Sequence, residues 1–118
     1  MADPRSVVDA YMRCLRTKDL AEQRRLLNDD LSFEGPFDRF TKADDYHQAL
    51  SHLVPMVDNI DVKKVFVDGD DVLVIFDMVT STPIGTAPVV EWHTIEGDKI
   101  SSIRAYFDAR PWAAAMGR

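Results

Sequence analysis

The apolar positions near the start of the chain repeat every three or four residues. Val7, Tyr11 and Leu15 have this spacing, which is typical of an amphipathic helix that buries one face. Pro4 suits the first helical turn, where its missing N–H needs no partner within the helix. The pattern therefore predicts a first helix within residues 3–19.

Two further helices and one short strand are predicted in the next part of the chain. The second helix begins at Asp19, and Glu22 stands three residues later to complete a capping box. The segment LSFE at residues 31–34 is too short for a helix and favours an edge strand. The third helix begins near Thr41 and ends before Pro55, because the residue that precedes a proline avoids helical geometry.

After Asn59 the apolar residues recur at every second position, which is the period of a β-strand. The turn sequences DGDD and EGDK separate some of the strands. The predicted strands span residues 60–67, 72–80, 89–95 and 100–108. Helices followed by hairpin-linked strands predict an α+β domain, in which the helices pack on one face of a curved antiparallel sheet.

Both faces of the second predicted strand are apolar, so we expect both to be buried. The row expected to face the helices and a pocket comprises Leu73, Ile75, Asp77 and Val79. The row expected on the outside, covered by a second subunit in a homodimer, comprises Val72, Val74, Phe76 and Met78. Asp77 is then an acid in a buried apolar row, which indicates a function unless the side chain reaches water or bonds a backbone amide.

The third and fourth strands are assigned to faces by their polarity. The residues expected to face the helices are Val90, Trp92, Ile103, Ala105 and Phe107. The residues expected on the outer face are Glu91, His93, Arg104, Tyr106 and Asp108. A histidine beside carboxylates also suits acid/base chemistry. An ion-paired outer surface or a dimer contact is the preferred interpretation.

Composition and charge narrow the class of protein. The 118 residues predict one domain, 1–118, with 46% apolar residues and enough length for a core. A net charge of −6 disfavours nucleic-acid and anionic-membrane partners, which need clustered basic residues. Cys14 is the single cysteine and no Cys/His cluster indicates zinc, so we expect neither metal nor cofactor. The chain lacks a bilayer-length apolar run and a signal-peptide pattern, so we expect a cytoplasmic protein.

Three stretches carry a resemblance to a known family, namely AYMRCLRTKDLAEQRRLLNDDLSFEGP, FTKADDYHQAL and GDKISSIRAYFD. From Val7 to Asp108 the order of elements resembles the nuclear-transport-factor-2-like (NTF2-like) fold, and the phrases resemble its SnoaL-like branch. That branch is similar to ketosteroid isomerases, limonene-epoxide hydrolases and polyketide cyclases. The resemblance implies a cone of three N-terminal helices packed on a strongly curved antiparallel sheet. It implies less about function, because this fold hosts unrelated activities.

The resemblance to ketosteroid isomerases is incomplete at their catalytic positions. It places Tyr11 at their oxyanion-binding tyrosine, but Gly35 at their catalytic aspartate. Glu34 is the neighbouring acid, and one step along a strand turns its side chain to the opposite face. Their second oxyanion donor falls near Val90. We therefore do not expect their mechanism here.

Of the catalytic residues of the epoxide hydrolases, this sequence has one acid and lacks that acid's partners. Asp77 matches one catalytic aspartate, while Ile75 replaces the arginine and Ala105 the second aspartate. The tyrosine and asparagine that hold water in those enzymes fall near Phe33 and Gly35. The polyketide cyclase base also falls near Ala105.

These observations predict a largely apolar pocket with a few polar groups, although the same residues could simply fill the core. Asp77 and Tyr11 are the candidate catalytic residues. The candidate ligand contacts are Leu15, Phe33, Met56, Trp92, Ile103 and Phe107. We expect a SnoaL-like protein for a small apolar metabolite, working as an acid/base isomerase, cyclase or hydrolase without metal if it is an enzyme. The alternative is a non-catalytic ligand-binding or dimerisation domain.

Overall fold

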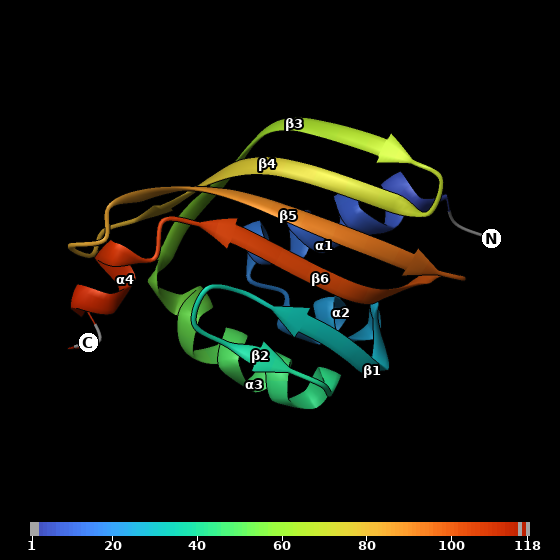
Figure 1. The fold of residues 1–118 in the computed structure, drawn as a ribbon, viewed down its shortest axis with the longest axis horizontal. Coiled ribbons are helices and arrows are strands. Elements are labelled where there is room, and N and C mark those ends of the chain that lie inside the picture. Colours follow the sequence, from blue (N-terminus) through green and yellow to red (C-terminus); the bar gives the residue numbers. More distant parts are fainter. Residues whose placement is uncertain (1–2, 116, 118) are drawn as a thin grey trace.

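The computed structural model describes residues 3–115 and 117, and Figure 1 shows their fold. The helices are α1 (Pro4–Thr17), α2 (Leu20–Arg25), α3 (Ala43–Leu53) and α4 (Arg110–Ala115), with a 3-10 turn η1 (Val54–Met56). The three helices predicted from the sequence are present, and α4 is an additional short helix. Asp3 caps α1, because its side-chain carboxylate accepts a hydrogen bond from the backbone N–H of Ser6 at 3.1 Å.

Six strands form one sheet. They are β1 (Leu27–Glu34), β2 (Arg39–Phe40), β3 (Val57–Asp68), β4 (Asp71–Thr80), β5 (Thr86–Glu96) and β6 (Lys99–Phe107). Their order across the sheet is β2-β1-β6-β5-β4-β3. The neighbours from β3 to β6 are antiparallel, but β1 runs parallel to β6. The predicted antiparallel sheet is therefore mixed at one pair, because β1 enters from α2 and does not join β6 through a hairpin.

The helices lie on one side of the curved sheet, as Figure 1 shows. Helix α1 contacts β3 to β6, and α3 contacts β1 and β2. Helix α4 follows the end of β6 and lies at the end of the molecule where the β4–β5 connection turns (Figure 1). This arrangement confirms the predicted α+β cone, in which helices cover the concave face of a curved sheet.

The two rows of β4 face the opposite way from the prediction. Val72, Val74 and Phe76 are completely buried against the helices. The outer row is half-buried and comprises Leu73, Ile75, Asp77 and Val79. Both rows are apolar, so polarity alone gave no way to choose between them. A one-residue error in the choice turns every side chain to the wrong face.

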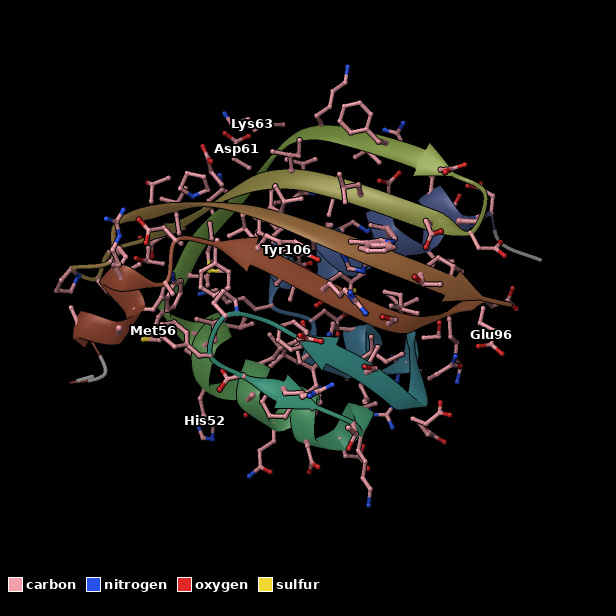
Figure 2. The ribbon with its side chains drawn as sticks, viewed as in Figure 1. His52, Met56, Asp61, Lys63, Glu96 and Tyr106 are labelled. Atoms are coloured by element: carbon pink, nitrogen blue, oxygen red, sulfur yellow. The ribbon has the colours of Figure 1, made fainter. Side chains whose placement is uncertain are left out.

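The predicted faces of β5 are also wrong, whereas those of β6 are correct. Glu91 and His93 are buried on the concave face, and Trp92 is 38% exposed on the outer face. On β6, Ile103 and Ala105 are buried. Arg104 and Tyr106 are exposed on the outer face, where Figure 2 shows Tyr106 in the middle of the sheet.

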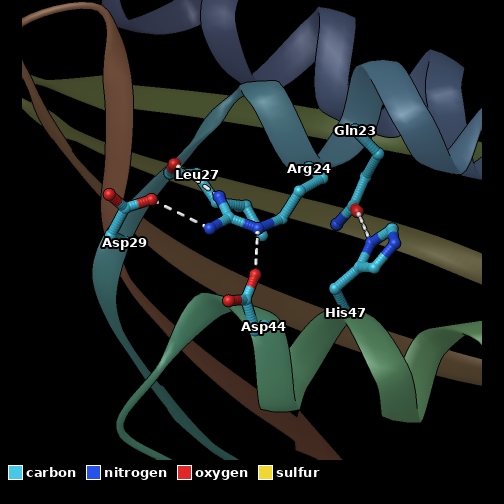
Figure 3. A network of polar contacts seen from close by, with 6 residues as sticks. All are labelled: Gln23, Arg24, Leu27, Asp29, Asp44 and His47. Carbon is cyan, nitrogen blue, oxygen red and sulfur yellow. Dashed lines mark hydrogen bonds and ion pairs between the residues drawn. The ribbon is translucent and has the colours of Figure 1, made fainter.

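A polar network joins α2, β1 and α3, as Figure 3 shows. The Arg24 guanidinium donates to Asp44 at 2.9 Å and to Asp29 at 2.8 Å, and also to the backbone carbonyl of Leu27. One charged side chain on α2 therefore fixes the start of β1 and the first turn of α3. This contact sets where α3, which carries Tyr46, lies against the sheet.

Candidate functional site

A cavity of about 410 Å³ lies between the helices and the concave face of the sheet. Its wall is largely apolar and is built by the β1–β2 loop, α3, η1 and the strands β3 to β6, with α4 closing one end. His52 and Met56, both exposed, lie at the α3–η1 part of the wall, and Figure 2 shows both side chains there. The cavity falls within the usual size range of small-molecule sites, which is about 300–1,000 Å³.

Glu91 is the buried carboxylate of this cavity. Its side chain lines the cavity and the residue is 7% exposed. The Nε2 atom of His93, two residues along the same face of β5, lies 3.0 Å from the Oε1 atom of Glu91. The residue opposite Glu91 on β6 is Ala105, and a Cβ atom added to Gly35 would lie 3.9 Å from the Cβ atom of Ala105. Ala105 and Gly35 both line the cavity. Ala105 places only a methyl group opposite the carboxylate, while the Phe33 ring lies 3.2 Å from the position that a Cβ atom on Gly35 would take.

Two tyrosine hydroxyls meet next to this carboxylate. Tyr11 on α1 and Tyr46 on α3 share a hydrogen bond, and Tyr46 lines the cavity. Burial raises the pKa of both hydroxyls well above the ordinary value, and the negative charge of Glu91 adds to the rise. Both hydroxyls therefore stay protonated at neutral pH, and one of them can donate a hydrogen bond into the cavity. The ring of Tyr11 also packs edge-on against His93, with centroids 5.2 Å apart.

Six aromatic side chains line the cavity in two groups. The β1–α3 group consists of Phe33, Phe40 and Tyr46, in which Phe33 stacks on Tyr46 with ring centroids 4.6 Å apart. The α4-side group consists of Phe37, Phe107 and Trp112, in which the rings of Phe107 and Trp112 meet edge to face at 5.7 Å. The cavity therefore has aromatic side chains from two separate parts of the fold.

The structure brings together most of the predicted ligand contacts. Leu15, Phe33, Met56 and Phe107 line the cavity. Tyr11 and Ile103 are completely buried in the core, and neither forms part of the lining. Tyr11 reaches the site through its hydrogen bond to Tyr46.

Two predicted residues lie on the outer face of the sheet, away from the cavity. The Asp77 carboxylate is 29% exposed and lies 3.9 Å from the Nζ atom of Lys63. Trp92 donates from its indole nitrogen to Asp71 at 3.0 Å. The interpretation of Asp77 as an acid in the pocket required it to face the helices, and its position on β4 removes that premise.

The side chain of Glu34 points away from the cavity, as the sequence indicated. Glu34 is exposed and lies opposite Arg104 in the parallel register of β1 and β6. Gly35 follows it and lines the cavity. No side chain therefore enters the cavity at the position where the isomerase resemblance placed an aspartate.

Sequence reasoning did not select Glu91 and His93 for the site because both were assigned to the surface as polar groups. One signal could have found them. They stand two residues apart, so they share a face of β5, and that face otherwise carries Ala87, Val89 and Ile95. A carboxylate and an imidazole in one apolar row can satisfy each other's hydrogen bonds, which permits their burial.

Two absences concern the described residues alone. Within residues 3–115 and 117, no helix has the length and apolar character needed to cross a bilayer. The same part of the chain has no group of three or more His, Cys, Asp or Glu side chains placed to hold a metal ion.

The helices, the curved sheet and the cavity between them define the class of NTF2-like folds. The family profile of the SnoaL-like domain matches residues 8–103, and the chain belongs to this family. None of the curated proteins matches the sequence.

Solved structures of the same fold come from several bacteria. An NTF2-like protein of unknown function from Cytophaga hutchinsonii is 24% identical, with a TM-score of 0.83 over 95% of this chain and 96% of that one. A candidate ketosteroid isomerase from Kribbella flavida is 18% identical, with a TM-score of 0.80 over 89% and 77% of the two chains. An LEH-like epoxide hydrolase from M. tuberculosis is 20% identical, with a TM-score of 0.76 over 96% and 95%. At these identities the likeness establishes the fold alone.

Proposed function

We propose that this chain is an acid/base enzyme for a small, largely apolar metabolite that binds in the cavity by one polar group. The observation that carries the proposal is the Glu91 carboxylate, buried in the wall of the cavity that Tyr46 also lines. Glu91 takes the role that the sequence analysis gave to Asp77. Tyr11 keeps a role as the hydrogen-bond partner of Tyr46.

Each residue has a part that follows from its position. Glu91 accepts a proton from the bound molecule, and Tyr46 donates a hydrogen bond to an oxygen on which negative charge develops. His93 contacts the Oε1 atom of Glu91 at 3.0 Å and so fixes the direction of the carboxylate. When a ligand fills the cavity, the ligand and the apolar wall exclude water, which strengthens both interactions. A base and a hydrogen-bond donor in one dry cavity suit isomerisation, cyclisation or hydrolysis, the activities of enzymes that share this fold.

Proton transfer can be tested with benzylacetone, a small aromatic ketone, as a carbon-acid probe. In D₂O the wild-type protein should accelerate deuterium exchange beside the carbonyl, measured by proton NMR. Glu91→Gln should lower the rate by about 10²–10⁴-fold, the usual contribution of a positioned acid or base. Glu34→Gln is the matched control, because Glu34 is an exposed carboxylate on the other side of the sheet and should leave the rate unchanged. Equal exchange rates for wild type and Glu91→Gln would contradict the proposal.

A further inference from the structure

The negative charge of Glu91 has no cationic side chain to balance it in the cavity. Within the described part of the chain, no lysine or arginine lines the cavity. Among the residues that the structure describes, His93 is the basic side chain within ion-pair distance of Glu91. The charge balance around the buried Glu91 therefore depends on the protonation of Glu91 and His93, while the exposed Asp38 and His52 also line the cavity.

The hydrogen bonds of His93 indicate a neutral imidazole beside an ionised Glu91. His93 is completely buried, and its Nδ1 atom has no hydrogen-bond partner. A doubly protonated ring would bury an unpaired N–H at Nδ1, and so would a ring that accepts a proton from Glu91 at Nε2. A neutral ring that donates from Nε2 to the carboxylate leaves only a lone pair unpaired at Nδ1, which avoids a buried N–H donor without an acceptor. Glu91 then carries a negative charge that His93 does not neutralise.

The aromatic side chains of the cavity wall are a second feature, besides the charge of Glu91, that determines which ligands bind. The β1–α3 group and the α4-side group together place six rings in the cavity wall. Aromatic faces attract cations through the ring quadrupole, and this attraction grows when the cation is removed from water. A carboxylate surrounded by aromatic rings favours a positively charged nitrogen attached to hydrocarbon. It disfavours a carboxylate or phosphate, which would meet like charge without a basic side chain nearby.

We propose that the cavity selects lipophilic amines in their protonated form, with the ammonium group against Glu91 and the hydrocarbon between the two aromatic groups. This proposal rests on the proposed function, because it names the substrate class of the same site. In this complex the ammonium nitrogen keeps its proton and donates a hydrogen bond to the Glu91 carboxylate. Ala105, the small residue opposite Glu91 on β6, leaves room for the ammonium group beside the carboxylate.

The test compares three probes with the same phenyl group and nearly the same length, namely phenethylamine, phenethyl alcohol and phenylacetate. Each is titrated at neutral pH into the ¹⁵N-labelled protein, and the backbone shifts of cavity residues report binding. Phenethylamine should bind at least about tenfold more tightly than phenethyl alcohol, a ratio that corresponds to about 1.4 kcal/mol. Phenylacetate should bind more weakly than either. In Glu91→Gln the ratio of amine to alcohol affinity should fall to about one, whereas Glu34→Gln should retain the wild-type ratio.

The outcomes separate this proposal from the proposed function. If the alcohol binds wild type as tightly as the amine, or if Glu91→Gln keeps the preference for the amine, selection of amines is overturned while the cavity remains a ligand site. If none of the three probes shifts cavity residues, both proposals fail. The wild-type comparison needs no variant, so it decides the question even if Glu91→Gln does not fold.

Discussion

The hydrogen bond between Tyr11 and Tyr46 should couple the two side chains in the free energy of unfolding. Tyr11 is completely buried and Tyr46 is 3% exposed. Removal of the Tyr46 hydroxyl leaves the Tyr11 hydroxyl inside the core without this partner, and an unpaired buried group costs about 1–3 kcal/mol. Tyr11→Phe should cost less, about 0.5–1.5 kcal/mol, because the Tyr46 hydroxyl can turn into the cavity and meet water there. Once the Tyr11 hydroxyl is absent, removal of the Tyr46 hydroxyl should cost little. In Tyr46→Phe, removal of the Tyr11 hydroxyl should restore part of the stability, because it removes the unpaired group.

The assay is a double-mutant cycle measured by urea unfolding, with tryptophan fluorescence as the signal. Tyr11→Phe/Tyr46→Phe should be less destabilised than the sum of the single variants by about 1–3 kcal/mol, the cost of Tyr46→Phe alone. Tyr106→Phe is the control, because Tyr106 is 52% exposed on the outer face and should add to Tyr11→Phe without coupling. Single variants whose effects add to within about 0.3–0.5 kcal/mol would refute the coupling and the role of Tyr11 as the partner of Tyr46.

Two further predictions concern pH and assembly. Because burial raises the pKa of Tyr11 and Tyr46 above the ordinary 10.0, their contribution to stability should be intact below that pH. This contribution should decline as the pH rises from 10.0 towards the folded-state pKa values, because tyrosine in the unfolded chain ionises first. In denaturant unfolding, the stability of Tyr11→Phe should therefore decline less steeply with alkaline pH than that of the wild type. An equally steep decline would contradict the prediction. The outer face exposes Phe66 at 50% and Trp92 at 38%, beside half-buried Ile75, so we expect a homodimer through this face. Light scattering should give twice 13.4 kDa for the wild type and 13.4 kDa for Ile75→Lys, and a 13.4 kDa wild type would contradict the prediction.

The elements of the fold could be predicted because their signals are local. The spacing of Val7, Tyr11 and Leu15 fixes the buried face of α1, and all three are buried. The alternation after Asn59 and the Gly69 and Gly97 turns, where φ is positive, indicate the long hairpins. Helix α4 is only six residues long and has no buried residue, so the sequence lacks the apolar period that would predict it.

The inward face of each strand was harder to predict, because it depends on contacts between strands. The pattern of β4 gives two apolar rows, and the packing of α1 on the sheet decides which row is buried. The register in which Val74 pairs with Glu91 then places Glu91 on the same face. Polarity then misled the assignment of β5. Glu91 looks like a surface residue until His93 is recognised as its hydrogen-bond partner within the same row.

The position of the carboxylate differs from the positions that the family resemblance indicated, and the surrounding residues give a physical reason. The resemblance placed acids at Gly35, Asp77 and Ala105, and near Val90 as a second oxyanion donor. Gly35 and Ala105 line the cavity as small residues, and Asp77 lies on the other face of the sheet. A carboxylate at Ala105, which lies opposite Glu91 in the register of β5 and β6, would stand close to Glu91, and two buried carboxylates at close range cannot both stay ionised without a cation between them. Among the described residues Glu91 is the buried acid, and the small Ala105 opposite it avoids this repulsion and leaves room for a ligand.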